Sequence, residues 1–311
     1  MQKTILSTAD VARLFDVTET TVKRWADEGT LKCQRTPGGH RKFEIRNVVE
    51  FAEKNKFDPV GAIEFMRDDR FSRAVQASVL SRDFPALAGE FVERATNADQ
   101  DDLLPLFSYL YEHKVALWEI FDLVIRLGMQ EIGERWLRGE LGVDDEHRAT
   151  ARTAEALAML MPQVLIKPEK KKSALLAAVG EELHDLGLRC AGYVFEAEGW
   201  RIHYLGARTP RSAVLATMKK APPDVVAISV SFGDAREATM ADLREISAAA
   251  HEIGAELAVG GRAAPAASGE SGIVDEILTS SKDVVEYIRR LAKENGAGPA
   301  EGKPKNEILE Q

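Results

Sequence analysis

The chain has 311 residues, 45% of them hydrophobic and 29% charged, with a formal net charge of −9. That length allows two or three domains with a sizeable core, and the acidic balance excludes a chain that binds nucleic acid over its whole surface. No segment resembles a signal peptide or an apolar run of about 18 residues, so we expect a cytoplasmic protein without membrane contacts. The two cysteines, Cys33 and Cys190, match no metal-ligand spacing and are expected to be reduced thiols.

Residues 1–58 are predicted to form a compact DNA-binding unit. "STADVARLF" predicts a helix that begins after Ser7 or Thr8, and "TETTVKRWADEG" predicts a second helix after a short turn. "RTPGGHRKFEI" predicts a hairpin that turns at Pro37-Gly38-Gly39, and "IRNVVEFAEKN" predicts a closing helix. Residues 20–43 have a local charge balance of +4, which is typical of one DNA-reading module on an acidic body.

A helix–turn–helix with a basic hairpin is suited to duplex DNA, because the second helix enters the major groove and the hairpin reaches the backbone as a wing. Thr20, Thr21 and Lys23 are placed to reach base edges. Phosphate contacts are expected mainly from the basic residues Lys23, Arg24, Arg35, His40, Arg41 and Lys42. A solvated hairpin would also carry "GG" and arginine, but "STADVARLFDVTETTVKRWADEGTL" followed by "RTPGGHRKF" resembles the MerR family of winged-helix transcription regulators. The resemblance implies a head that works in dimers or higher assemblies.

Residues 59–166 have a helical pattern throughout. Apolar residues recur at three- and four-residue spacing in "FPALAGEFVERATN", "DDLLPLFSYLYEH", "VALWEIFDLVIRLGMQEIGERWLRG" and "VDDEHRATARTAEALAMLMPQ". Four such segments with short connections predict an antiparallel four-helix bundle. "KPEKKK", residues 167–172, predicts a solvated linker.

The pattern changes over residues 173–294. "SALLAAV", "RIHYL", "DVVAISV" and "AELAVG" alternate with helix-like stretches at 184–198, 211–220 and 236–253. This alternation predicts a doubly wound, Rossmann-like α/β domain with a parallel sheet and helices on both faces. Residues 295–311, rich in Gly, Pro and charge, are expected to be a disordered tail. The predicted chain is therefore multidomain, with a winged helix–turn–helix, a helical bundle and an α/β domain in that order.

The loops at the carboxyl ends of the predicted strands carry a candidate site. Parallel sheets bind ligands at this edge, where loops from several strands converge. The groups expected to meet there are Glu182, His184 and Gly187 after the first strand, Ser229 and Ser231 at the third, and Gly260 and Gly261 after the fourth. Taken alone, His184 is either a solvated residue in a first helical turn or a metal ligand held by Glu182.

The pattern acid-x-His-x-x-Gly, then Ser, then Gly-Gly resembles the cobalamin-binding fold of methionine synthase and the corrinoid mutases. Glu182 stands where Asp is usual, and Ser231 where Leu is usual. The resemblance implies that His184 is the lower axial cobalt ligand and replaces the cofactor's own dimethylbenzimidazole, whose nucleotide tail enters the groove beside the serines and glycines. Glu182 would then accept a hydrogen bond from the distal ring nitrogen, which fixes the tautomer and raises the basicity of the coordinating nitrogen.

Trp136, followed after nine residues by Glu146-His147, resembles the motif of the CarH/LitR group of light-sensing, cobalamin-dependent MerR repressors. This resemblance, from residue 3 to about 290, implies that the bundle caps the upper face of the corrin, with Trp136 over the upper axial group and Glu146 and His147 near the adenosyl moiety. A tryptophan in a bundle core, and a Glu-His pair that merely favours a helix N-terminus, are the plainer readings.

The group usually has histidine directly after the tryptophan, where this chain has Leu137, and leucine cannot bind cobalt. Three alternatives stay open: His147 substitutes, water takes the position, or the protein senses cobalamin without light. His113, His203 and His251 are expected to be surface or packing residues.

The resemblance implies a non-enzymatic repressor that binds adenosylcobalamin, forms a dimer or tetramer on double-stranded operator DNA in the dark, and releases the DNA when light breaks the cobalt–carbon bond. RNA polymerase would be affected only indirectly. The alternatives are a light-independent sensor of cobalamin, for example methylcobalamin, a corrinoid methyl carrier with a DNA-binding head, and an interaction domain that has lost its cofactor. The predicted lid over the corrin counts against the carrier, and the complete Glu182–His184–Gly187 set counts against the last.

Overall fold

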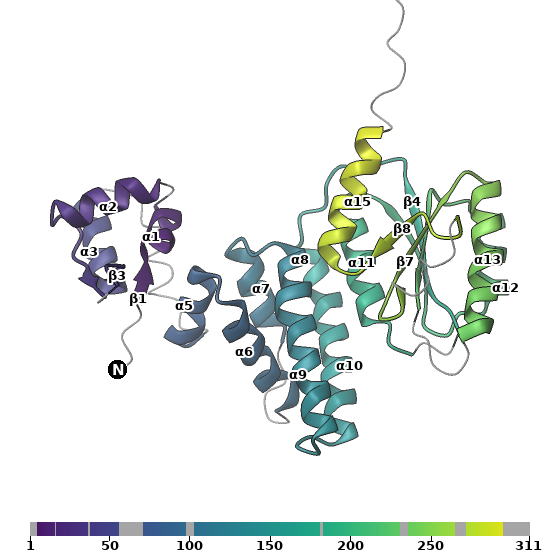
Figure 1. Cartoon of the computed structure of the whole chain (residues 1–311), viewed down its shortest axis with the longest axis horizontal. Coiled ribbons are helices and arrows are strands. Elements are labelled where there is room, and N and C mark those ends of the chain that lie inside the picture. The colour runs from purple at the N-terminus through teal and green to yellow at the C-terminus, as the bar shows by residue number, and fades with distance from the viewer. Residues whose placement is uncertain are drawn as a thin grey trace, which may run out of the picture. The chain divides into compact units, whose positions relative to one another are not determined.

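The computed structural model divides the chain into two compact units, Met1–Gln163 and Val164–Gln311 (Figure 1). It describes residues 5–15, 17–36, 38–55, 71–97, 103–180, 183–230, 236–264 and 272–294. The boundary predicted after residue 58 and the tail predicted at 295–311 lie outside the described residues. None of the described helices has the length and apolar content needed to cross a membrane.

The N-terminal head is a winged helix–turn–helix, as predicted. Its elements are β1 (Ile5–Ser7), α1 (Thr8–Leu14), α2 (Glu19–Asp27), β2 (Gln34–Arg35), β3 (Arg41–Glu44) and α3 (Ile45–Lys54). Ser7 is the residue that caps α1, because its hydroxyl accepts from the Asp10 amide at 3.2 Å. The sequence did not predict β1, which adds a third antiparallel strand in the order β1-β3-β2. Buried Val22, Phe43 and Phe51 hold the helices against this small sheet.

The helical part of the first unit contains the predicted four-helix bundle. Its elements are α6 (Phe84–Thr96), α7 (Leu104–Glu112), a long helix made of α8 (Leu117–Glu119), η1 (Ile120–Ile125) and α9 (Arg126–Leu137), and α10 (Val143–Leu160) with a 3₁₀ turn η2 (Met161–Gln163). The η1 segment is π-helical. A Cβ at Gly128 would lie 2.2 Å from the Phe91 ring, so the glycine permits the close approach of α9 to α6. Helix α5 (Arg73–Ser81) lies in the region predicted to be helical, although it was not among the four named segments, and it packs Leu80 against the core of the head.

The second unit is a doubly wound parallel sheet, as predicted. Its elements are β4 (Ser173–Ala178), α11 (Leu186–Ala197), β5 (Arg201–Gly206), α12 (Arg211–Lys220), β6 (Val225–Ser229), α13 (Arg236–Glu252), β7 (Glu256–Gly260), β8 (Glu276–Leu278) and α15 (Ser281–Glu294). The strand order is β5-β4-β6-β7-β8. Helices α11 and α15 pack together on one face and α12 and α13 on the other (Figure 1). The last strand and last helix were not predicted as separate elements.

The segment 167–172 is mostly exposed, as expected for a linker, but its backbone is hydrogen-bonded to the α/β domain that follows. The Lys167 amide donates to the Ala197 carbonyl at 2.9 Å, and the Lys170 amide donates to the Gly199 carbonyl at 2.7 Å. A Cβ at Gly199, where φ is +85°, would lie 2.4 Å from the Pro168 carbonyl oxygen. The glycine therefore allows this segment to lie directly on the turn between α11 and β5.

Candidate functional site

The topology of the second unit defines where its ligand site should lie. Strands β4 and β6 are neighbours, yet the helices that follow them, α11 and α13, lie on opposite faces of the sheet (Figure 1). The chain therefore leaves the carboxyl ends of these two strands in opposite directions. Open α/β sheets bind their ligands outside such a switch point.

The structure brings Ser229, Gly260 and Gly261 together at this edge. Ser229 pairs with Gly260 across β6 and β7, and the Val230 amide donates to the Gly260 carbonyl at 2.9 Å. Gly261 has a φ of +98°, and a Cβ there would lie 2.5 Å from the Val230 carbonyl oxygen and 3.1 Å from Ser229 Oγ. Backbone geometry therefore requires the second glycine of the pair, and it leaves this rim without side-chain bulk. Ser231 lies outside the described residues.

His184 lies in the loop after β4, and its side chain is exposed. Its neighbour Asp185 is fixed: the carboxylate accepts from the Tyr204 hydroxyl at 2.9 Å and from Arg189 Nη2 at 2.9 Å. Burial, together with the hydrogen bond to Asp185, raises the pKa of Tyr204, so the hydroxyl remains a donor. The sequence reasoning missed this anchor, although the spacing of Asp185 and Arg189 by four residues on a helix was a visible signal. Glu182 lies outside the described residues.

Gly187 differs from the other two glycines. No described atom lies within 4 Å of a Cβ built there. Packing of the protein itself therefore does not demand a glycine at this position, which is consistent with space kept for a ligand. The described residues contain no group of three or more His, Cys, Asp or Glu placed to hold a metal ion. The space at Gly187 and the glycine rim at Gly260 and Gly261 fit a large cofactor, such as a corrin, that brings its own metal ligands.

The second set of predicted residues flanks the turn between α9 and α10. Trp136 and Leu137 end α9 with 44% and 76% of their surface exposed, so Trp136 is not the core residue of the plainer reading. Asp145 provides the helix cap, because its carboxylate accepts from the Gly142 amide at 2.9 Å. Glu146 is therefore not the capping residue of α10. Its carboxylate accepts from the Thr150 hydroxyl at 3.1 Å, and its Oε2 lies 3.6 Å from Nε2 of the exposed His147.

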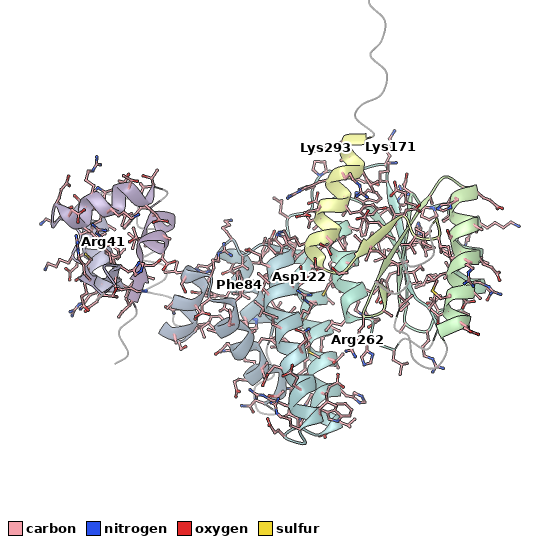
Figure 2. All side chains as sticks on the ribbon, viewed as in Figure 1. Arg41, Phe84, Asp122, Lys171, Arg262 and Lys293 are labelled. Carbon is pink, nitrogen blue, oxygen red and sulfur yellow. The ribbon has the colours of Figure 1, made fainter. Side chains whose placement is uncertain are left out.

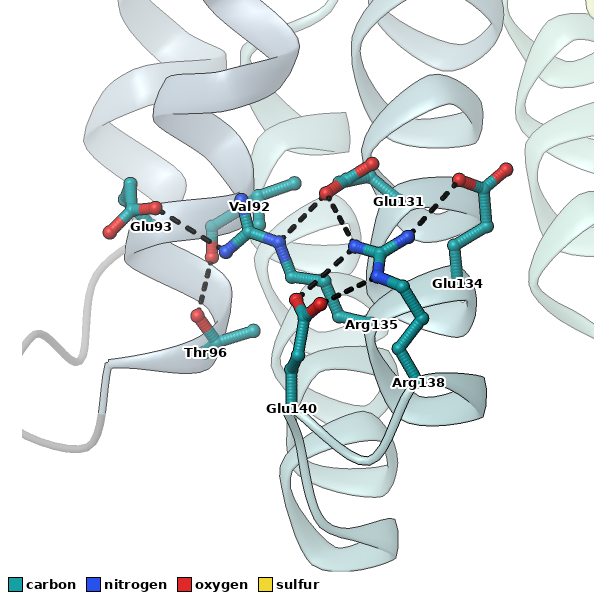
Figure 3. Close-up of polar contacts among 8 residues, drawn as sticks. All are labelled: Val92, Glu93, Thr96, Glu131, Glu134, Arg135, Arg138 and Glu140. Carbon is teal, nitrogen blue, oxygen red and sulfur yellow. Dashed lines mark hydrogen bonds and ion pairs between the residues drawn. The ribbon is translucent and has the colours of Figure 1, made fainter.

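A set of alternating charges, here called the charge ladder, holds the end of α9 (Figure 3). Arg135 Nε donates to Glu131 at 2.8 Å, and Arg138 Nε donates to Glu140 at 2.6 Å. Arg135 also lies 3.5 Å from Glu93 on α6, which ties the two helices together. Hydrogen bonds from these arginines lower the pKa of Glu131 and of Glu140. Sequence reasoning did not single out the ladder, although Glu131 and Arg135 are spaced by four residues.

The predicted base-reading residues all lie on α2. Thr20 is exposed, whereas Thr21 is partly engaged, because its amide donates to the helix cap Thr18 at 3.3 Å. Lys23 is exposed and lies 3.3 Å from Glu19. These are weak surface pairs that leave the side chains able to reach DNA.

The predicted phosphate-contacting residues differ in how freely they can reach DNA. Arg24 and His40 are exposed, whereas Lys42 on β3 is half-buried. Arg35 and Arg41 both bind Asp27 at the end of α2, with Nη2 to Oδ1 distances of 2.7 and 2.6 Å, and Arg41 reaches Oδ2 at 2.8 Å as well. The Arg35 side chain is 60% exposed and that of Arg41 17%. Figure 2 labels Arg41 among the side chains of the N-terminal head. The sequence reasoning counted Asp27 only as an opposing charge.

Two of the remaining histidines are engaged within the protein. His113 Nδ1 lies 2.8 Å from the Tyr109 carbonyl oxygen, and His251 Nε2 lies 2.9 Å from Asp275. His203 is half-buried on β5. None of the three lies in a loop at the carboxyl edge of the sheet.

Comparisons with known families match the same regions. A helix-turn-helix domain family matches residues 5–56, and two families that are both described as a B12 binding domain match residues 87–161 and 172–289. A solved relative, the Methanosarcina barkeri monomethylamine corrinoid protein, has a TM-score of 0.54 at 16% identity, covering 66% of this chain and 96% of its own. At that identity the likeness concerns the fold alone.

Two curated relatives join these domains in one chain. The HTH-type transcriptional repressor CarH of Myxococcus xanthus is 24% identical over 238 residues, which is 70% of this chain and 76% of that protein. The HTH-type transcriptional repressor CarA of the same organism is 25% identical over 231 residues, covering 70% and 74%. The fold, the sheet edge and the family matches define a helix–turn–helix transcription regulator with B12-binding domains. The likeness to the two relatives narrows this class of protein to a CarH-like, cobalamin-binding regulator.

Proposed function

We propose that the chain is a MerR-type transcriptional repressor, and not an enzyme, whose binding to double-stranded operator DNA is controlled by adenosylcobalamin and light. One observation carries this proposal. A DNA-reading head with a basic wing is joined in one chain to a sheet edge where His184 is exposed after β4 and Ser229 meets Gly260 and Gly261. Such a chain can link the state of a bound cofactor to the occupancy of DNA.

In this proposal His184 is the lower axial ligand to cobalt and Glu182 holds its distal ring nitrogen. Gly187 leaves room for the nucleotide tail, together with four residues at the ends of β6 and β7 or directly after them: Ser229, Ser231, Gly260 and Gly261. Trp136, Glu146 and His147 contact the upper face of the cofactor. When bound, adenosylcobalamin supplies a cobalt–carbon bond that light can break.

Among the described residues of the head, Lys23, Arg35 and Arg41 are paired with acids, which reduces the net charge that a single head offers to DNA. A dimer or tetramer in the dark would place several heads on one stretch of DNA, and linked weak contacts gain affinity through effective concentration. We propose that Trp136 would change its contacts once light has altered the bound cofactor, so that the oligomer would dissociate and the operator would be released. RNA polymerase is then affected only through access to the promoter.

The experiment that tests this function combines absorbance, mass and DNA binding. The full chain is loaded with adenosylcobalamin in the dark, and its spectrum, solution mass and DNA affinity are recorded before and after green light. A spectrum typical of histidine-ligated cobalamin, with an oligomer that dissociates and loses DNA on illumination, is the expected result. Binding of cobalamin with no change of mass or DNA affinity in light would rule out the light response.

Leu137 favours a second candidate, a light-independent cobalamin sensor that takes, for example, methylcobalamin. Its side chain is 76% exposed at the end of α9, beside Trp136, and it cannot bind cobalt. Leu137→His separates the two candidates. If the wild type ignores light while Leu137→His gains a light-dependent spectrum with two histidine ligands, the wild-type chain is the light-independent sensor.

A further inference from the structure

The end of helix α2 and the wing share one ionic contact. Asp27 is the last residue of α2, and its carboxylate binds Arg35 of β2 and Arg41 of β3. These two arginines lie directly opposite each other in the antiparallel register of the wing. Like charges in directly opposed positions destabilise a strand pair. Asp27 therefore removes a repulsion inside the wing and, by the same bonds, attaches the wing to the helix expected to read the major groove.

The two arginines are held to different degrees. The Arg41 side chain is only 17% exposed and reaches both oxygens of Asp27, and its Nε is buried without a hydrogen-bond acceptor among the described residues. Arg35 gives one bond to Oδ1 and is 60% exposed. A DNA phosphate can therefore replace Asp27 at Arg35 with little movement, whereas Arg41 cannot leave without exposing the inner side of the wing.

We propose that Asp27 is a specificity-determining positioning residue: through Arg41 it fixes the wing at a set place relative to α2, and it presents Arg35 to a DNA phosphate. This rests on the proposed function as a DNA-binding regulator. The two arginines would then have different roles, because Arg41 acts within the protein whereas Arg35 binds DNA. Base contacts from α2 and backbone contacts from the wing must be made at the same time, so a loose wing weakens the register between them.

The test compares Asp27→Asn with Glu28→Gln in the full chain loaded with adenosylcobalamin in the dark. Glu28 is the matched control, since it follows Asp27, is similarly exposed, and pairs with Arg24 at 3.9 Å and with neither wing arginine. The probes are a duplex selected by the wild-type chain from a random-sequence pool, and a scrambled duplex of the same composition. Both variants remove one negative charge, so both should bind the scrambled duplex at least as well as the wild type.

Only Asp27→Asn should lower the ratio of selected to scrambled affinity, on the order of tenfold, the discrimination of about one lost contact. Arg41→Gln should lower this ratio similarly. The double variant Asp27→Asn/Arg41→Gln should lower the ratio no further than either single variant. Arg35→Gln should instead weaken both duplexes alike and reduce the salt dependence by about one phosphate contact. An equal ratio in Asp27→Asn and Glu28→Gln would overturn the proposal.

A second readout needs no DNA. In the wing, the Thr36 amide donates to the His40 carbonyl at 2.9 Å and the Gly39 amide donates to the Thr36 carbonyl at 2.8 Å. Hydrogen exchange at these two amides should accelerate several-fold in Asp27→Asn and stay at the wild-type rate in Glu28→Gln. Equal exchange in both variants would overturn the clamping role. A wild-type chain that selects no duplex would count against the proposed function. The exchange rates would in that case still test the contact between Asp27 and the wing.

Discussion

The two sets of residues predicted to bind cobalamin, one in each unit, are held in place in different ways. At the sheet edge, the positions of Ser229, Gly260 and Gly261 follow from strand register and from backbone atoms within 2.5–2.9 Å of where a glycine Cβ would stand. The end of α9, which carries Trp136, is instead held by the solvent-accessible ion pairs of the charge ladder. Backbone register resists salt and pH, whereas exposed ion pairs do not. The difference suggests a fixed platform in one unit and an adjustable contact in the other.

The largest expected effect comes from breaking the platform with Gly261→Ala. The new Cβ would combine a φ of +98° with a 2.5 Å contact to the Val230 carbonyl oxygen. We expect a loss of about 2–4 kcal/mol in the free energy of unfolding, measured by chemical denaturation. Gly187→Ala is the control, since its Cβ has open space. It should leave stability within about 0.5 kcal/mol while weakening cobalamin binding, and equal stability losses in both variants would contradict this.

The next effect concerns the ligand on that platform. His184→Ala should leave the fold intact, because the side chain is exposed. Bound cobalamin should then shift toward the form that keeps its own base, visible in the absorbance spectrum. His203→Ala, in the adjacent strand β5, is the control and should keep the wild-type spectrum. A spectrum that His184→Ala leaves unchanged would remove His184 from the ligand set.

A smaller effect is expected from the anchor of the His184 loop. Tyr204→Phe removes the hydroxyl that donates to Asp185 at 2.9 Å and keeps the ring on which Arg189 lies. The expected cost is about 1 kcal/mol, the net value of one hydrogen bond. Hydrogen exchange should accelerate at the amides of residues 183–187 in the free protein, with the amides of α15 as the internal reference. Equal acceleration in both regions would indicate general destabilisation and not a local anchor.

The smallest effect belongs to the charge ladder. The folded pKa values of Glu131 and Glu140 lie below the usual 4.5 because of the neighbouring arginines. Their stabilisation is therefore present above pH 4.5 and is lost as the pH falls through the lower, folded values. Arg138→Gln should reduce this acid-side loss of Tm and make Tm less sensitive to salt. Arg126 is an exposed arginine on the same helix that donates to a backbone carbonyl. Arg126→Gln should therefore change neither the pH dependence nor the salt dependence of Tm.

The same contrast explains what the sequence could predict. Strand ends are marked by short apolar runs, and parallel strands end at one edge, so Ser229 and the glycine pair were placed together correctly. The sequence did not predict the Asp185–Tyr204 hydrogen bond or the contact of Asp27 with the wing. Each joins two segments whose distance in space is known only from the folded structure. The three-residue strand β8 was missed, and helix α5 was not separated from the rest of the helical region, because a short element contains too few periodic residues to be recognised. Apolar periodicity in a sequence predicts helices and strands, whereas the polar contacts between these elements can be assigned only once the fold is known.

The π-helical segment Ile120–Ile125 gives the long bundle helix one residue more than an α-helical turn would hold. Each residue of an α-helix turns the chain by about 100°. Because the wider turn absorbs that extra residue, deleting one residue within this segment would let the helix close into regular α-helix and leave Trp136 facing the same way. Deleting one residue from the regular helix that follows, before Trp136, would instead rotate Trp136 by about 100°. The π-helical segment is therefore the place in the long helix where chain length can change by one residue without redirecting Trp136.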